Sequence, residues 1–257
     1  MKIDGNTVLI TGGTSGIGAA LAQRLRDVGN HVIVAGRRQD ALDKVVRAQE
    51  RMSGLVLDVA DPDSIRAAAD QVVRDHPALN VLVNMAGIMK FEDATSKRSL
   101  DDAEATIATN LMGPIRMTDA LIDQLTGAAN AAIINVSSGL GFVPLTTTPT
   151  YSASKAAIHF YTVALREQLR GKVEVIELVP PAVATELTPG QSKRPGYMPL
   201  SEFIDEVMEL LGRQPTPPEL LVERVAMQRF AERENRFDAT LKKMNEMAAA
   251  ARAQAGG

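Results

Sequence analysis

The feature that most restricts the fold of this chain is a regular alternation of short apolar segments with longer segments of helical periodicity. The apolar segments are rich in Val, Ile and Leu and have strand length; they lie at residues 7–11, 31–35, 55–57, 81–83, 132–136 and 173–179. Apolar residues with helical spacing separate them, at 17–28, 40–49, 61–75, from Ser99 onward with an interruption at Pro114, and at 150–170. Strands that alternate with helices form a parallel sheet covered on both faces, so we expect a single α/β domain over residues 1–257 with a doubly wound parallel sheet.

A glycine-rich turn, Thr11-Gly12-Gly13-Thr14-Ser15-Gly16-Ile17-Gly18, joins the first expected strand to the first expected helix. Unpaired backbone N–H groups and the helix dipole favour a phosphate at such a helix N-terminus, and glycines let the backbone come close to it. This context is typical of a Rossmann-type dinucleotide-binding fold. It predicts cofactor binding at Gly12, Thr14, Ser15, Gly16, Ile17 and Gly18; the alternative is an ordinary strand-to-helix turn.

Two arginines follow the second expected strand, in the sequence Ala35-Gly36-Arg37-Arg38. NAD-binding folds carry an acidic residue in this place, which holds a ribose hydroxyl. Guanidinium groups attract a 2′-phosphate instead, so we expect NADP(H) to be preferred over NAD(H), with Arg37 the stronger candidate. The alternative is a pair of solvated arginines at the start of a surface helix.

Tyr151 and Lys155 lie four residues apart, in the sequence Tyr-Ser-Ala-Ser-Lys, and therefore share one face of an expected helix. A nearby cation favours the ionised form of a phenol, which would let Tyr151 exchange protons with a substrate oxygen. In the alternative interpretation Tyr151 faces the core and Lys155 faces solvent.

Taken together, these motifs resemble the short-chain dehydrogenase/reductase family over nearly the whole chain through Thr185. The further matching positions are Asp58, Asn84-Met85-Ala86-Gly87, Asn110 and Ser138. The resemblance implies a catalytic set of Asn110, Ser138, Tyr151 and Lys155. In that set Ser138 would hydrogen-bond the reacting oxygen, Asn110 would hold a water, and Lys155 would lower the pKa of Tyr151 and bind the nicotinamide ribose. Ser137 is the alternative to Ser138, and a plain exposed helical residue is the alternative for Asn110.

The resemblance also implies where the cofactor would lie. Asp58 would meet the adenine amino group, and further contacts are expected at Val59, Asn84, Ala86, Gly87, Tyr151, Lys155, Pro181, Val183 and Thr185. At Pro180-Pro181 a second proline stands where the family usually has glycine, which fixes φ and removes an N–H on the nicotinamide side. This variant resembles the DltE-like branch of the family.

The function implied by the resemblance is that of an NADP(H)-dependent oxidoreductase, which transfers a hydride between the nicotinamide and a carbonyl or secondary alcohol with Tyr151 as general acid and base. A non-catalytic dinucleotide-binding sensor on the same fold is the alternative, and a dehydratase or epimerase is a third reading. The identity of the substrate stays open, because residues 186–214, which are expected to form a lid, have the least regular pattern.

Composition restricts the partners. Lys and Arg total 28 against 31 for Asp and Glu, so no general attraction to nucleic acid is expected, and the chain has no cysteine. The three histidines are far apart in sequence, which predicts no metal site. No signal-peptide pattern and no apolar run of the roughly 20 residues that span a bilayer is present, so we expect a cytoplasmic protein with a small-molecule substrate and no membrane partner.

The C-terminal part departs from the usual ending of the family. Residues 225–247 are predicted to form a charged helix, and residues 248–257, rich in Ala and Gly, a flexible tail. Because the usual C-terminal contacts are missing, a homodimer formed through the two long helices is expected rather than a tetramer.

Overall fold

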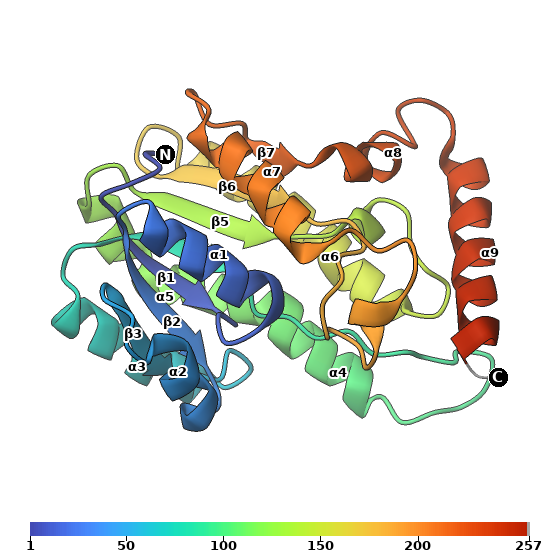
Figure 1. Ribbon diagram of the computed structural model, residues 1–257, viewed down its shortest axis with the longest axis horizontal. Helices are drawn as coiled ribbons and strands as arrows, with labels where there is room; N and C mark the ends of the chain where they lie inside the picture. The colour runs from blue at the N-terminus through green and yellow to red at the C-terminus, as the bar shows by residue number, and fades with distance from the viewer. Residues whose placement is uncertain (256–257) are drawn as a thin grey trace.

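The computed structural model describes the backbone of residues 1–255 and the side chains of residues 1–251, and shows a parallel sheet between layers of helices (Figure 1). The strands are β1 (Thr7–Thr11), β2 (His31–Gly36), β3 (Met52–Val56), β4 (Leu79–Asn84), β5 (Ala132–Val136), β6 (Glu174–Val179) and β7 (Glu219–Leu221). They form one sheet of seven strands in the order β3-β2-β1-β4-β5-β6-β7, and every pair is parallel. The predicted doubly wound Rossmann-type sheet is confirmed.

The strand order reverses direction between β1 and β4, because the chain builds β2 and β3 on one side of β1 and the remaining strands on the other. Ligands of open α/β sheets bind outside the carboxyl ends of the strands at such a switch point. We therefore expect a ligand to bind at the loops that follow β1, β4 and β5.

The helices alternate with the strands along most of the chain. They are α1 (Gly16–Asp27), α2 (Gln39–Val46), α3 (Pro62–Asp75), α4 (Asp101–Ile107), α5 (Gly113–Gly127), α6 (Pro149–Gln168), α7 (Leu200–Gly212), α8 (Ala226–Arg229) and α9 (Phe237–Ala255). Short irregular turns complete the set: the π-helical turn η1 (Ala108–Met112) and the 3₁₀ turns η2 (Gly139–Gly141), η3 (Gln191–Lys193) and η4 (Glu223–Val225).

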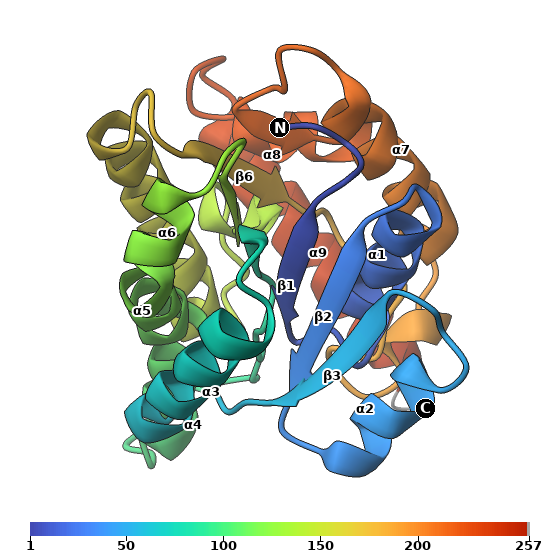
Figure 2. The same ribbon diagram turned by 90° about the vertical axis from the view of Figure 1, so that its left-hand side faces the viewer.

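Two apolar cores hold the layers together, one on each face of the sheet. Alternate residues of β1 divide between them: Val8 and Ile10 pack with α1, α2 and α7, while Leu9 packs with α3, α5 and α6. Figure 2 shows the sheet edge-on between these two helical layers. Burial on both faces explains why the strands have continuous apolar runs in place of the alternation of a half-exposed strand.

Three expectations about the helices differ from the structure. The expected kink at Pro114 takes the form of the π-helical turn Ala108–Met112 directly before α5, in which Pro114 lies in the first turn. The expected helix at 225–247 is divided into α8 and α9 by a turn that includes Asn235 at φ 56°. The expected flexible tail at 248–257 is helical as far as Ala255, and residues 256–257 lie outside the described part of the chain.

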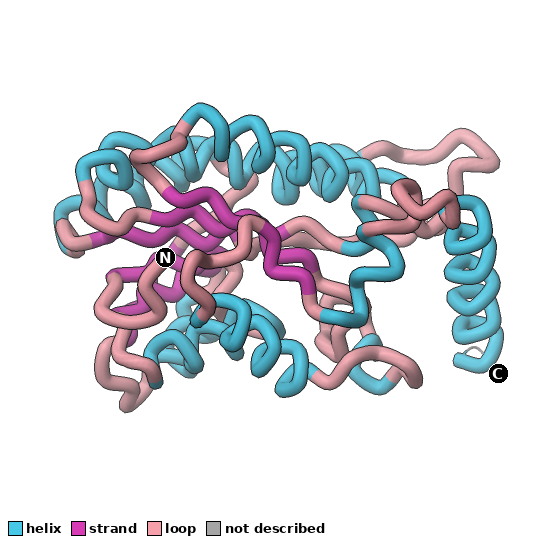
Figure 3. Tube along the Cα trace, turned by 90° about the horizontal axis from the view of Figure 1, so that it is seen from above, coloured by secondary structure: helices cyan, strands magenta, loops and turns pink. Residues whose placement is uncertain are grey.

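Helix α9 stands at one end of the molecule, beside the C-terminus marked in Figure 3. Its Asn245 accepts hydrogen bonds from the backbone N–H and the hydroxyl of Thr146, at 2.8 and 2.9 Å, and donates one to the carbonyl of Pro144. These bonds attach α9 to the loop that connects β5 with α6. None of the helices in the described part of the chain is both long and apolar enough to cross a membrane.

Candidate active site

The four residues of the predicted catalytic set come from three elements that meet beyond the carboxyl ends of β4 and β5. Ser138 follows β5 and caps η2, Asn110 lies in the π-helical turn η1, and Tyr151 and Lys155 lie in the first half of α6. All four side chains are buried, with exposed fractions between 1% and 7%. The structure therefore brings together residues that are up to 45 positions apart in the sequence.

Tyr151 and Ser138 are joined by a hydrogen bond between their side chains. Burial raises the pKa of the Tyr151 phenol to about 12, and the bond with Ser138 only partly offsets that effect. The Ser138 hydroxyl oxygen also accepts a hydrogen bond from the backbone N–H of Leu140 at 3.2 Å, which fixes its position. At neutral pH the phenol is thus protonated and is able to act as a proton donor.

Lys155 lies on the same face of α6, with its Nζ 5.8 Å from the centroid of the Tyr151 ring. The ammonium donates a hydrogen bond of 2.8 Å to the carbonyl of Val136, the last residue of β5. Burial lowers the pKa of Lys155 to about 8. The expected lowering of the Tyr151 pKa by Lys155 is not found in this structure, because the burial of the phenol outweighs its neighbours.

Asn110 holds the loop that follows β4. Its Oδ1 accepts the N–H of Ile88 at 2.9 Å, and its Nδ2 donates to the carbonyl of Ile88 at 2.8 Å and to the hydroxyl of Ser154 at 3.2 Å. A Cβ atom on Gly87 would lie 3.4 Å from Asn110 Oδ1 and 3.7 Å from Lys155 Nζ. Gly87 therefore faces the same space as these two polar groups.

The structure also bears on the choice between the two neighbouring serines. Ser138 bonds with Tyr151, whereas the hydroxyl of Ser137 is buried and has no hydrogen-bond partner among the described residues. The Ser137 backbone N–H pairs with the carbonyl of Leu178 and so continues the sheet. This arrangement favours Ser138 as the residue that meets a reacting oxygen.

The glycine turn after β1 packs tightly against the loop after β4. Gly12 has φ +68°, and a Cβ there would lie 2.7 Å from the Cα of Ala86. The hydroxyl of Thr11 accepts the backbone N–H groups of Met85 and Ala86 at 3.0 and 3.1 Å. The two loops at the switch point of the sheet are thereby joined, and both border the space in front of α1.

The start of α1 retains free backbone donors. Its N-cap, Ser15, forms no side-chain capping bond, and its first turn contains no acidic residue. A Cβ on Gly16 would lie 3.6 Å from the side chain of Thr185, so the segment after β6 passes over this helix start. A diphosphate fits this arrangement of amide groups and glycines.

Arg37 and Arg38 follow β2 and are exposed, and neither guanidinium forms a hydrogen bond or ion pair with another described residue. Thr14 packs on Gly36, where a Cβ would lie 2.7 Å from the Thr14 methyl group, so the glycine turn and the arginines are neighbours. Asp58 is half-buried after β3, and its Oδ1 accepts the N–H of Ala60 at 3.0 Å. These positions suit the adenosine half of a dinucleotide.

Three predicted cofactor residues serve the protein interior in this structure. The amide of Asn84 donates to Asn135 at 2.9 Å and to Thr118 at 3.3 Å, so its side chain points between β5 and α5. Val59 packs against the position where Gly113 would carry a Cβ, and the carbonyl of Val183 accepts from Gln191 at 3.0 Å. These contacts support the loops around the site, and a cofactor contact of the three residues stays a prediction.

Sequence patterns missed three residues that shape the site. Thr11 and Ser154 stand inside the recognised motifs but were given no role of their own, and their small hydroxyl side chains at those places were the available signal. Gln228 lies in α8 and packs against Gly139, directly after Ser138, where a Cβ would lie 2.4 Å from its Oε1. No local pattern connects residues so far apart in sequence.

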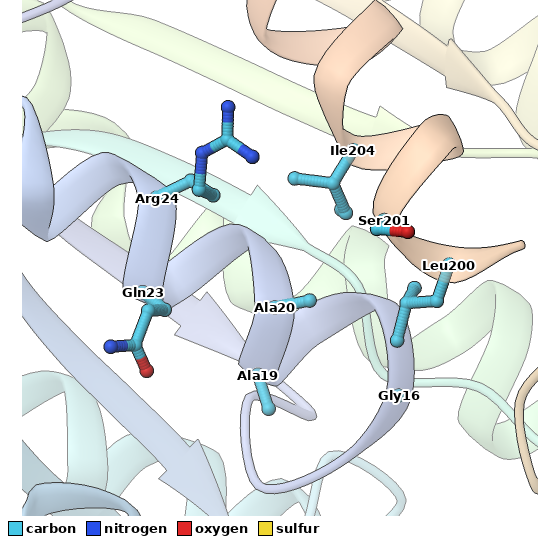
Figure 4. A pocket seen from close by; sticks show the side chains of 8 residues that line it. All are labelled: Gly16, Ala19, Ala20, Gln23, Arg24, Leu200, Ser201 and Ile204. Carbon is cyan, nitrogen blue, oxygen red and sulfur yellow. The ribbon is translucent and has the colours of Figure 1, made fainter.

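A separate groove of about 460 Å³ lies between α1 and α7. Figure 4 shows Ala19, Ala20, Gln23 and Arg24 on one side of it and Leu200, Ser201 and Ile204 on the other. None of the four predicted catalytic residues lines it, although Gly16 of the glycine turn does. Within the described residues, no group of three or more acidic or histidine side chains is arranged to hold a metal ion.

Comparison with known proteins shows which family the chain matches. A family model described as short chain dehydrogenase matches residues 6–195. A Bacillus subtilis (strain 168) protein named "Uncharacterized oxidoreductase DltE" is 38% identical over 257 aligned positions, which cover 95% of this chain and 98% of that protein.

Solved structures with the same fold contain either NADP or NAD. A short chain dehydrogenase from Burkholderia cenocepacia J2315 in complex with NADP has a TM-score of 0.80 at 25% identity, and the match covers 94% of this chain and 99% of that one. A short chain dehydrogenase/reductase from Burkholderia phymatum in complex with NAD has a TM-score of 0.79 at 22% identity, with 91% and 95% coverage.

Proposed function

The chain belongs to the short-chain dehydrogenase family, where it resembles the DltE-like branch, and on that premise we propose that it is an NADP(H)-dependent oxidoreductase acting on a carbonyl or secondary alcohol. One observation carries the proposal: the Tyr151 phenol is buried, protonated and hydrogen-bonded to Ser138, beside the ammonium of Lys155. A proton donor of this kind suits a substrate oxygen that gains negative charge.

The residues at the switch point fit a dinucleotide. The diphosphate would lie against the tight glycine turn and the uncapped start of α1. A 2′-phosphate would meet Arg37 and Arg38, which have no other partner among the described residues. When bound, the nicotinamide would supply or accept the hydride. Gly87 leaves space beside Asn110 and Lys155, on the side where the nicotinamide ribose would be held.

In reduction, Tyr151 holds the proton at its phenol oxygen and gives it to the substrate oxygen. The Ser138 hydroxyl bonds the phenol and would hydrogen-bond the same substrate oxygen when a substrate is bound. As the proton leaves, the phenolate gains stabilisation from the Ser138 hydroxyl, whose hydrogen bond already offsets part of the effect of burial on the phenol pKa. Asn110 keeps the β4–η1 loop in place through its two bonds to Ile88, so the reacting groups stay aligned.

The proposal is tested by incubating the purified protein with NADPH and a panel of aldehydes and ketones, and following the loss of NADPH absorbance. We expect carbonyl-dependent oxidation of NADPH that depends on Tyr151. The sensor alternative predicts NADPH binding without consumption. It is not favoured, because the catalytic set is complete and the family relative that covers nearly the whole chain carries an oxidoreductase name.

The cofactor preference rests on the β2–α2 connection. A charge-assisted contact between Arg37 and a 2′-phosphate would be lost in Arg37→Ala, so we expect the Kd for NADPH to rise about 10- to 100-fold, with the Kd for NADH nearly unchanged. Arg47→Ala, at the other end of α2, is the control and should bind NADPH as the wild type does. Equal affinity of the wild type for NADPH and NADH would refute the preference.

A further inference from the structure

The helix α8 covers the loop that carries the catalytic serine, and one of its side chains is placed unusually. Gln228 packs on Gly139, with Oε1, Cδ and Nε2 only 2.4, 2.6 and 2.8 Å from the place that a Cβ of residue 139 would occupy. Gly139 thus provides the space that the carboxamide fills. Gly139 directly follows Ser138 and is the first residue of η2.

This carboxamide has no partner within the described part of the chain. Gln228 is 8% exposed as a whole residue, and its side chain forms no hydrogen bond with any other described residue. Its amide atoms are not among the fully buried polar atoms that lack a partner, so they reach solvent beside the loop that carries Ser138. An amide in this place, with donors and an acceptor that no other described residue uses, is available to a bound ligand.

The position of α8 is well defined. The next residue, Arg229, forms a bidentate ion pair with Glu219 of β7, at 2.6 and 2.8 Å. Its guanidinium also lies 4.7 Å from the centroid of the Phe142 ring, in the loop after η2. Helix α8 is in this way attached both to the sheet and to the catalytic loop, so Gln228 is held in a fixed place.

The chemistry of the surroundings limits the kind of ligand. A carboxamide offers one acceptor and two donors and carries no charge, which suits a hydroxyl group. The neighbouring cation, Arg229, is already paired with Glu219, so little positive charge remains for a carboxylate or phosphate. The group that meets Gln228 is expected to be neutral and close to the reacting carbon, because Ser138 and Gly139 are adjacent.

We propose that Gln228 is a substrate-binding residue, which hydrogen-bonds an uncharged hydroxyl group on the carbon next to the reacting carbonyl. This inference rests on the proposed oxidoreductase function and names its substrate class as hydroxy ketones and hydroxy aldehydes.

Kinetics with two ketones that differ only in this hydroxyl test the proposal. Wild-type protein with NADPH should have a higher kcat/KM for acetoin than for methyl ethyl ketone, and Gln228→Met should lower that ratio by at least about fivefold. An unchanged ratio in the variant overturns the inference while leaving the proposed function intact. Absence of NADPH consumption with every carbonyl in the panel counts instead against the proposed function.

Binding provides a readout that is independent of turnover. Saturation-transfer NMR should show acetoin bound to the wild-type protein with NADP⁺ present, and the signal should weaken in Gln228→Met. If acetoin does not bind, or binds equally to both proteins, the inference is wrong.

Thermal stability distinguishes a binding role from a structural one. Because the Gln228 amide has no partner within the protein, Gln228→Met should leave the Tm unchanged or raise it. The matched control is Gln191→Met: this glutamine is also buried, but its amide is bonded to Thr188 and Val183, so the substitution should lower the Tm by several degrees. A fall in Tm for Gln228→Met as large as that for Gln191→Met would contradict the proposal.

Discussion

Single residues at the active site owe their chemistry to burial as much as to their neighbours. Tyr151 and Lys155 are both almost inaccessible to water, which favours the neutral form of each. The pKa of the phenol rises to about 12 and that of the ammonium falls to about 8. The phenol therefore carries its proton throughout the neutral pH range, while Lys155 gains or loses its charge near pH 8.

Lys155 should make the stability of the protein depend on pH. Its pKa is about 8 in the folded chain against an ordinary value of 10.5. Between these values the unfolded chain binds more protons, so stability rises with pH across that window, and below about pH 8 the full penalty of a buried charge remains. The difference corresponds to about 3 kcal/mol at most.

We expect Lys155→Met to be more stable than the wild type at pH 7, by up to about 3 kcal/mol less the lost bond to the carbonyl of Val136. The advantage should shrink as pH rises above about 8 and disappear near the ordinary lysine pKa. Urea unfolding at several pH values measures the stability difference between variant and wild type and its change with pH. Lys172→Met, at an exposed position, is the control. A difference that does not change with pH would contradict this account of Lys155.

At this scale the sequence predicted which residues meet but not their environment. The sequence placed Ser138, Tyr151 and Lys155 in one predicted set, and their side chains lie together in the structure. The direction of the Tyr151 pKa was predicted wrongly, because burial depends on loops that fold over the site from distant parts of the chain. The Asn84 amide nitrogen donates to Asn135 and Thr118, contacts that the sequence did not indicate.

Among the elements, the turn between β1 and α1 has the strictest backbone requirements. Gly12 and Gly5 have nearly the same φ, +68° and +69°, but only Gly12 is in close contact with another loop; a Cβ on Gly5 would have nothing within 4 Å. The pair therefore separates the effect of a left-handed backbone from the effect of close packing against Ala86.

We expect both Gly5→Ala and Gly12→Ala to lose about 1–2 kcal/mol through the unfavourable φ, and Gly12→Ala to lose about 1–3 kcal/mol more through overlap with Ala86. Urea unfolding measures the difference. Only Gly12→Ala should also weaken NADPH binding, which fluorescence titration measures. Equal losses of stability in the two variants, or equal NADPH affinities, would argue against a close-packed cofactor turn.

Elements with a strong local pattern were predictable, and those defined by distant contacts were not. The six expected strands and the helices between them are found with shifts of a few residues at their ends. The break between α8 and α9 was missed, because apolar spacing continues across Asn235 while the chain turns there with a positive φ. The role of α8 depends on contacts with β7 and η2, which no local pattern records.

For the whole molecule, the doubly wound sheet places the candidate catalytic residues and the glycine turn beyond the carboxyl ends of its strands, and the alternation of strands and helices predicted such a parallel sheet. The position of α8 beside the loop after β5 could not be anticipated, because it depends on contacts between parts of the chain that are far apart in sequence. The outer face of α6 adds a further feature: Phe160 and Val163 are 72% and 38% exposed.

We expect this apolar face of α6 to be covered in a homodimer, since large exposed apolar side chains on one helix face mark contact surfaces. The protein should have the mass of a dimer in size-exclusion chromatography with light scattering, and Phe160→Glu should produce monomers. Met247→Glu, an equally accessible position on α9, is the control and should remain dimeric. A monomeric wild type, or a Phe160→Glu variant that stays dimeric, would exclude this interface.

The central claim is that Tyr151 delivers the proton, and a single-turnover experiment with Tyr151→Phe tests it most directly. The variant keeps the ring and should bind NADPH with nearly the wild-type Kd, but its rate of NADPH oxidation on mixing with a carbonyl substrate should fall by about 100- to 10,000-fold. Tyr161→Phe removes a half-buried phenol from the same helix, hydrogen-bonded to Thr118 away from the site, and should keep the wild-type rate. Oxidation of NADPH by Tyr151→Phe within about tenfold of the wild-type rate would contradict the account.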